Sequence, residues 1–159
     1  MARLYGYAPY GQRLLDWVPY GHWKTTTFVG GLTSHGLIAP MVLDGAMNAA
    51  AFTAYIEQVL AKEIRPGDVV ILDNLPAHKT TSVRAAFARC DINVLYLPPY
   101  SPDLNPIENA FSKLKRLIRT AAERTVDGLW RAIGKLIDSF SPHECRAYFR
   151  HCGYPATFN

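Results

Sequence analysis

The stretch VVILDNLPAHKTTSVRAAFARCDINVLYL, residues 69–97, contains two short apolar runs separated by a segment with helical periodicity. The first run, Val69–Leu72, is closed by Asp73, and the second, Val94–Leu97, is closed by two prolines. Short continuous apolar runs with such boundaries are typical of strands that are covered on both faces. A helix near residues 81–89 joins them, so we expect a β-α-β unit with parallel strands.

Upstream of this unit, two runs rich in β-branched and aromatic residues, near 23–31 and 37–43, flank a turn at Ser34–Gly36. This pattern predicts an antiparallel hairpin. Asn48 can cap the helix that follows, whose apolar positions form one buried stripe: Phe52, Tyr55, Ile56, Val59 and Leu60. Another short strand is predicted near Leu14–Val18.

Downstream, the proline-rich segment 98–102 must be an ordered loop, since proline suits neither a helix interior nor a central strand. A helix then begins with Asn105 as N-cap and Pro106 in the first turn. Two more helices are predicted, one spanning 126–140 and one opened by the capping-box sequence at Ser141. The order of elements predicts one α/β domain with a mixed sheet and flanking helices.

The composition is that of a globular protein with a mildly basic balance. Of the 159 residues, 49% are apolar and 19% charged, and 17 Lys and Arg against 13 Asp and Glu give a net charge of +4. A polyanionic partner suits this charge. No apolar run is long enough to span a membrane, and three irregularly spaced cysteines do not indicate a disulfide framework. We therefore expect a soluble, cytoplasmic protein without a membrane partner.

Two carboxylates lie in positions suited to chemistry. Asp73 ends a strand, at the edge where open α/β sheets place their ligands, and Glu108 lies in the first turn of a helix. Rigidly held carboxylates suit hard cations, and two Mg²⁺ or Mn²⁺ ions can promote in-line attack on a phosphodiester. The alternatives are that Asp73 only ends a strand in a turn, and that Glu108 only completes an N-x-x-E cap with Asn105.

Basic side chains suggest how a nucleic acid would be held. His78 and Lys79 follow Asp73 closely and can contact a phosphate, or His78 can orient a metal-bound water, although a solvated loop pair is the alternative. The helix that carries Glu108 has basic outward positions that suit contacts with a DNA backbone: Lys113, Lys115, Arg116 and Arg119. A merely solvated helix face is the alternative there.

A longer signature surrounds these residues. The segments LPPYSPDLNPIENAFSKLK (97–115) and VVILDNLPAHK (69–79), with 34 residues between Asp73 and Glu108, resemble the mariner superfamily of DDE transposases in its bacterial insertion-sequence branch. Residues 2–13, 21–32 and 123–134 also resemble this branch. The resemblance implies a ribonuclease H-like fold, a two-metal Mg²⁺ or Mn²⁺ site, double-stranded DNA at element ends and target as substrate, and metal-binding roles for Asp73 and Glu108.

The resemblance also implies a first metal-binding Asp on a strand ahead of Ala2. We therefore expect one catalytic domain over residues 1–159 that lacks its first strand and an upstream helix-turn-helix region. Neither Asp16 nor Asp44 stands where this ligand belongs. The metal site would then be incomplete and the isolated chain inactive.

Three functional hypotheses remain open at this point. The chain is part of a transposase that cuts and joins DNA, or it is a relic that only binds DNA or an intact transposase. A homodimer is the other association that we consider. A third hypothesis is a structure-selective nuclease such as a junction resolvase, which also uses clustered carboxylates. The segment SPDLNPIE, residues 101–108, argues against the third.

Overall fold

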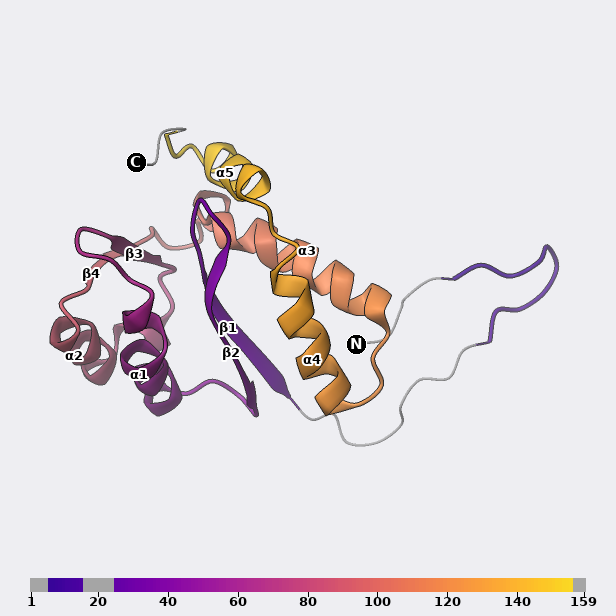
Figure 1. The fold of residues 1–159 in the computed structure, drawn as a ribbon, viewed down its shortest axis with the longest axis horizontal. Coiled ribbons are helices and arrows are strands. Elements are labelled where there is room, and N and C mark those ends of the chain that lie inside the picture. Colours follow the sequence, from indigo (N-terminus) through magenta and orange to yellow (C-terminus); the bar gives the residue numbers. More distant parts are fainter. Residues whose placement is uncertain (1–5, 16–24, 156–159) are drawn as a thin grey trace.

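The structure is a computed structural model that describes residues 6–15 and 25–155. The described elements comprise four strands, β1 (Thr26–Leu32), β2 (Leu37–Asp44), β3 (Val69–Leu72) and β4 (Asn93–Tyr96), and five α-helices, α1 (Ala49–Gln58), α2 (Thr81–Arg89), α3 (Pro106–Ala121), α4 (Val126–Ile137) and α5 (Pro142–His151). Short 3-10 helices lie at Leu60–Lys62 (η1), Pro76–Lys79 (η2) and Pro102–Leu104 (η3). The architecture is therefore mixed α/β (Figure 1).

The predicted hairpin and β-α-β unit are both confirmed. β1 pairs antiparallel with β2, and β3 pairs in parallel with β4 in the register Val70 opposite Val94. The described residues form two separate two-stranded sheets, however, where the sequence predicted one mixed sheet. Local patterns specify each pair of strands, but which sheet edges join is decided by long-range packing. Of the strand predicted near 14–18, residues 14 and 15 are not in a strand, and 16–18 lie outside the described residues.

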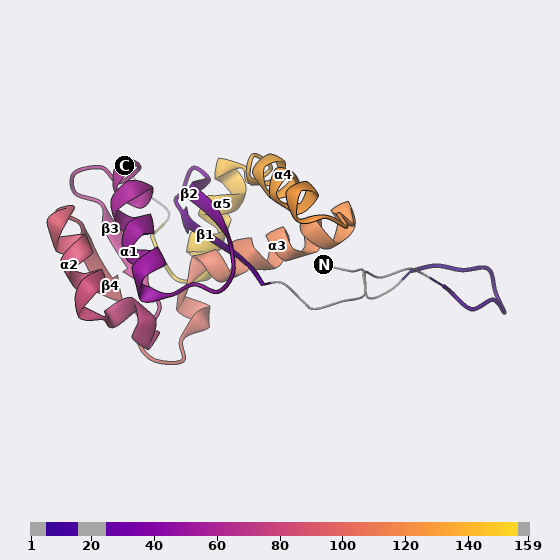
Figure 2. The same ribbon diagram turned by 90° about the horizontal axis from the view of Figure 1, so that it is seen from below.

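The β1–β2 hairpin lies between two hydrophobic clusters. One face of the hairpin, including Val29 and Met41, packs against a first cluster built largely on α1 and α2. The opposite face, including Phe28 and Val42, packs against a second cluster built on α3, α4 and α5. Because successive strand residues point to opposite faces, one hairpin can serve both clusters. Figure 2 shows this order, with α1, α2, β3 and β4 on one side of the hairpin and α3 to α5 on the other.

Side-chain caps begin most of the helices where the sequence predicts them. Asn48 Oδ1 accepts a hydrogen bond from the Ala51 amide, and Ser141 Oγ accepts one from the Glu144 amide. Such caps satisfy amides that have no partner within the helix. Asn105 occupies the N-cap position of α3 with Pro106 in the first turn, as predicted, but its side chain makes no capping hydrogen bond. Asn105 is therefore the N-cap by position only, and the capping interpretation of the Asn105–Glu108 pair has no side-chain hydrogen bond from Asn105 to support it.

The β3–β4 pair is covered on one face and not on the other. Val70, Leu72 and Val94 pack against the first cluster. Val69 is 54% exposed and Leu95 is 55% exposed, so the prediction that these strands are covered on both faces is wrong for the described residues. An apolar run reveals that a segment avoids water, but it does not reveal which element supplies the cover.

The remaining described segment, residues 6–15, extends away from the body of the molecule (Figures 1 and 2). Its Tyr7 and Tyr10 side chains are fully exposed. Within the described ranges, no helix combines the length and the apolar character needed to cross a membrane.

Candidate metal site and nucleic-acid surface

Asp73 lies at the carboxyl end of β3, directly after Leu72. Its side chain is 39% exposed, so solvent and ligands can reach the carboxylate. Oδ1 accepts a hydrogen bond of 3.3 Å from the Leu75 amide, which is the Asx turn that ends the strand. The turn interpretation of Asp73 is thus correct as far as Oδ1 is concerned, and it leaves Oδ2 available.

The imidazole of His78 lies beside the same carboxylate. Helix η2 turns the chain back after Pro76, and this places His78 Nδ1 2.6 Å from Asp73 Oδ1. The ring also stacks on Phe52 of α1, with centroids 4.7 Å apart. The sequence indicated that His78 lies near Asp73 but did not reveal this contact. The only sequence signal for this contact is the turn that Pro76 begins between the two residues.

Glu108 lies in the first turn of α3, as predicted, and it is exposed. Its backbone amide is hydrogen-bonded to the Asn105 carbonyl at 3.1 Å. The buried face of the same helix, including Ala110, Leu114 and Ile118, belongs to the second cluster. The packing of α3 therefore fixes the position of the Glu108 backbone while the carboxylate stays open to solvent.

The basic residues named from the sequence fall into two groups. Lys115, Arg116 and Arg119 are exposed on α3. Lys113 is engaged within the protein, because its Nζ donates to Glu144 Oε2 at 2.5 Å and to the Ser139 carbonyl at 3.0 Å. Helix α3 therefore presents three exposed basic side chains, whereas Lys113 is paired with Glu144 of α5.

The ion pair of Lys113 with Glu144 is part of a small network. Tyr148 Oη donates to Glu144 Oε1 at 2.6 Å, so both carboxylate oxygens accept a hydrogen bond. Burial by itself would raise the pKa of Glu144, but the hydrogen bonds from Lys113 and Tyr148 and the charges of Lys113 and Arg116 lower it below its ordinary value. Burial and the bond to Glu144 raise the pKa of Tyr148. The network joins α3 to α5.

Lys79 takes a different position from its neighbour His78. Its Nζ lies 5.2 Å from the centroid of the Tyr96 ring, in a cation–π arrangement. Tyr96 in turn donates from its hydroxyl to the His78 carbonyl at 3.0 Å. The segment after Asp73 is thus held against β4.

The donor chemistry of Asp73 and Glu108 fits a hard divalent cation, because both are carboxylates that keep at least one oxygen accessible. Among the described residues, no group of three acidic, histidine or cysteine side chains is close enough together to hold a metal ion. The described part of the chain therefore supplies two candidate ligands and not a complete coordination sphere.

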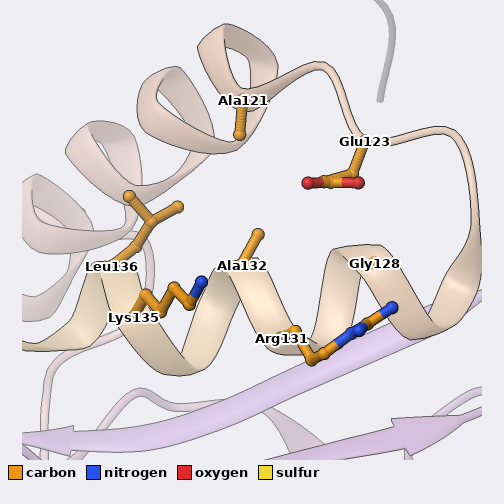
Figure 3. Close-up of a pocket in the computed structure, with 7 residues that line it drawn as sticks. All are labelled: Ala121, Glu123, Gly128, Arg131, Ala132, Lys135 and Leu136. Atoms are coloured by element: carbon orange, nitrogen blue, oxygen red, sulfur yellow. The ribbon is translucent and has the colours of Figure 1, made fainter.

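The cavities lie elsewhere in the molecule. One of about 440 Å³ lies along α4 and beside the end of α3, where Glu123, Arg131 and Lys135 supply polar atoms (Figure 3). Ala121, which also lines it, is 13 residues beyond Glu108, or about 20 Å along the helix at 1.5 Å per residue. A second, apolar cavity of about 220 Å³ lies between β1, α3 and α4. Neither of these two cavities is lined by Asp73 or Glu108.

The sequence is similar to those of a known protein family. The model of a family described as "DDE superfamily endonuclease" matches residues 1–129, which include both Asp73 and Glu108. The chain belongs to this family. Among its relatives, the Tc1 transposase of Caenorhabditis elegans is 35% identical in an alignment of 104 residues that covers 58% of this chain and 38% of that protein. The Tcb1 transposase of Caenorhabditis briggsae is 31% identical in an alignment of 98 residues that covers 54% of this chain and 36% of that protein.

Solved structures show the same fold for this member of the DDE superfamily. The Mos1 strand transfer complex matches with a TM-score of 0.52 at 22% identity, covering 95% of this chain and 50% of the Mos1 chain. The Mos1 mariner paired-end complex with Mn matches with a TM-score of 0.50 at 23% identity, covering 93% and 50%. The chain spans half of these structures and less than half of the curated relatives that it matches.

Proposed function

We propose that this chain is the catalytic part of a cut-and-paste DNA transposase with a ribonuclease H-like fold, in which Asp73 and Glu108 bind Mg²⁺ or Mn²⁺. The observation that carries this proposal is the family match over residues 1–129, which contains both carboxylates. In the structure one of them ends β3 and the other begins α3, each on a packed element and each accessible. The signature around Glu108 favours an insertion sequence as the mobile element.

The bound ions would polarise a phosphodiester and activate the attacking oxygen, which is the chemistry that paired metals supply in nucleases. The protein's own contribution is to hold the two carboxylates in place. Asp73 is held by β3 and its turn, and Glu108 by the buried face of α3. A Mos1 paired-end complex was solved with Mn, which supports the choice of cation.

We further propose that a third acidic ligand comes from outside the described residues, since these contain no group of three candidate ligands. Relatives extend well beyond the matched part, and a segment of that kind preceding these residues would supply the ligand. On this proposal the 159 residues by themselves do not cleave DNA.

DNA would pass along the exposed basic face of α3. Three of its side chains stand free to contact phosphates: Lys115, Arg116 and Arg119. Lys113 is left out of this surface because Glu144 already neutralises it. A Mos1 transposase paired-end complex was solved with a transposon end, which supports DNA as partner.

Cleavage of element-end DNA tests the catalytic proposal. A complete transposase reconstructed around these residues should cut the element ends with Mg²⁺, and Asp73→Ala or Glu108→Ala should abolish cutting. Asp127→Asn is the matched control, because Asp127 is also acidic and also lies in the first turn of a helix. Unchanged cutting by either alanine variant would refute the metal-binding role, and robust Mg²⁺-dependent nicking by the 159 residues alone would refute the need for a further ligand.

The salt dependence of binding tests the DNA surface. Each lost phosphate contact lowers the slope of log K against log salt by about 1. Replacing all three free basic residues of α3 by Gln should therefore lower the slope by about 3. Replacing Arg131 and Lys135 of α4, which lie at the cavity beside the far end of α3, should leave it unchanged. The surface is wrong if the two sets of substitutions have equal effects.

A further inference from the structure

We propose that His78 is the positioning residue for Asp73, and that it directs the carboxylate so that Oδ2 is the oxygen that binds the cation. This inference rests on the proposed function, because it concerns the same carboxylate. It begins from the 2.6 Å separation between His78 Nδ1 and Asp73 Oδ1. Nδ1 is buried and makes no hydrogen bond of good geometry to a described residue, and the Asp73 carboxylate is the acceptor that lies beside it.

The imidazole is held in place by elements outside its own turn. Its ring stacks on Phe52, which is 6% exposed and part of the first cluster, with an interplanar angle of 27°. The main chain of His78 is held separately, by the hydroxyl of Tyr96 on β4. The side chain of His78 is itself only 20% exposed. With its ring fixed by α1 and its backbone by β4, His78 presents Nδ1 to Asp73 in one orientation.

The contacts of Asp73 are unequally divided between its two oxygens. The Leu75 amide and His78 Nδ1 both approach Oδ1. Two donors on one oxygen restrict rotation of the carboxylate about its side-chain bonds. They also leave the lone pairs of Oδ2 for a cation, which favours binding through a single oxygen. Partners of this kind behind a ligand orient it, and their loss typically weakens metal affinity by about 10- to 100-fold.

If His78 serves only to pack against Phe52, a different result is expected. If the imidazole only fills space against Phe52, an aromatic ring without a donor should replace it at no cost to the cation. His78→Phe keeps the stacking surface and removes Nδ1, whereas His78→Asn places an amide donor near the position of Nδ1 and removes most of the ring. The two variants therefore separate packing from hydrogen bonding.

The first measurement needs no metal. Nitrogen-15 NMR of the 159-residue chain should show His78 with its proton on Nδ1. Asp73→Ala should return the ring to the Nε2–H tautomer that free imidazole prefers. His143, which is exposed on α5, serves as the internal reference and should not respond. A wild-type ring protonated on Nε2 alone, or a ring indifferent to Asp73→Ala, would overturn the inference.

The second measurement is the affinity of the reconstructed complete transposase for Mn²⁺, followed by electron paramagnetic resonance, because the described residues supply only two candidate ligands. His78→Phe should weaken binding by about 10- to 100-fold, His78→Asn should recover most of the loss, and His143→Phe should change nothing. Equal affinities of wild type and His78→Phe, while Asp73→Ala abolishes binding, would overturn the role of His78 and leave the proposed function standing. Affinity unaffected by Asp73→Ala would instead overturn the metal-binding role of Asp73 and the inference with it.

Discussion

Replacing Glu144 by Gln should destabilise the protein by breaking the network that joins α3 to α5. Glu144 accepts hydrogen bonds from Lys113 and Tyr148, one on each oxygen. The Lys113 and Glu144 side chains are 17% and 30% exposed, so water screens the pair only in part. Hydrogen bonds to charged groups contribute about 1.5 to 3 kcal/mol, and fully exposed pairs about 0 to 1 kcal/mol. We expect a loss between these cases, about 1 to 2 kcal/mol.

The assay is a double-mutant cycle with Lys113→Met and Glu144→Gln, read by urea unfolding at several pH values. Because the fold lowers the pKa of Glu144, the ionised form is favoured in the folded protein. Its stabilising effect is fully present above the unfolded-state pKa of about 4.3 and is lost as the pH falls through the lowered folded-state pKa. The coupling energy should therefore be constant from pH 7 to pH 5 and should decline as the pH falls below the unfolded-state pKa of about 4.3.

The ion pair of Arg89 with Glu57 supplies an internal control. Its side chains are 58% and 35% exposed, so its coupling energy should stay below about 0.5 kcal/mol. If the double-mutant cycle at Lys113 and Glu144 gives no larger coupling energy than this control, partial burial does not strengthen the ion pair. A coupling energy that increases as the pH falls below about 4.3 would contradict the lowered pKa of Glu144.

Two other predictions concern the core and the thiols. Ile56→Ala should cost about 2 to 5 kcal/mol in urea unfolding, because Ile56 is fully buried in the first cluster, and a loss under 1 kcal/mol would show that this cluster is loosely packed. Burial raises the pKa of the Cys145 and Cys152 thiols, so a disulfide reagent at pH 8 should modify the more accessible Cys90 first. Faster reaction of Cys145 would contradict its place in the second cluster.

The features that could be predicted from the sequence are those set by neighbouring residues. The β-α-β unit follows from two apolar runs and the helix between them, and the predicted bounds of α2 match the structure. The caps at Asn48 and Ser141 follow from side chains that reach amides three residues away. Each of these interactions joins residues that are only a few positions apart. A short stretch of sequence therefore contains all the residues that make the interaction.

The features that could not be predicted depend on residues distant in the sequence. The apolar run at Val69–Leu72 did not show that Val69 and Leu95 would stay exposed, because their cover would have to come from another element. The helical pattern places Lys113 on the outward face, but Glu144, 31 positions away, forms an ion pair with it. The partner of His78 was missed for a similar reason, since the ring is aimed by Phe52 from a different helix.

The distribution of the two carboxylates bears on how a metal site forms in this fold. Asp73 follows a strand that packs on the first cluster, and Glu108 begins a helix that packs on the second. The β1–β2 hairpin contributes one face to each cluster, so it packs between the elements that carry Asp73 and Glu108. One of its contacts is Phe28 against Phe111 of α3, with ring centroids 5.9 Å apart. If the two carboxylates bind metal as proposed, substitutions in this packing should lower the rate of cleavage without removing a ligand, because misplacement of a reacting group by about 1 Å can cost about 100-fold in rate.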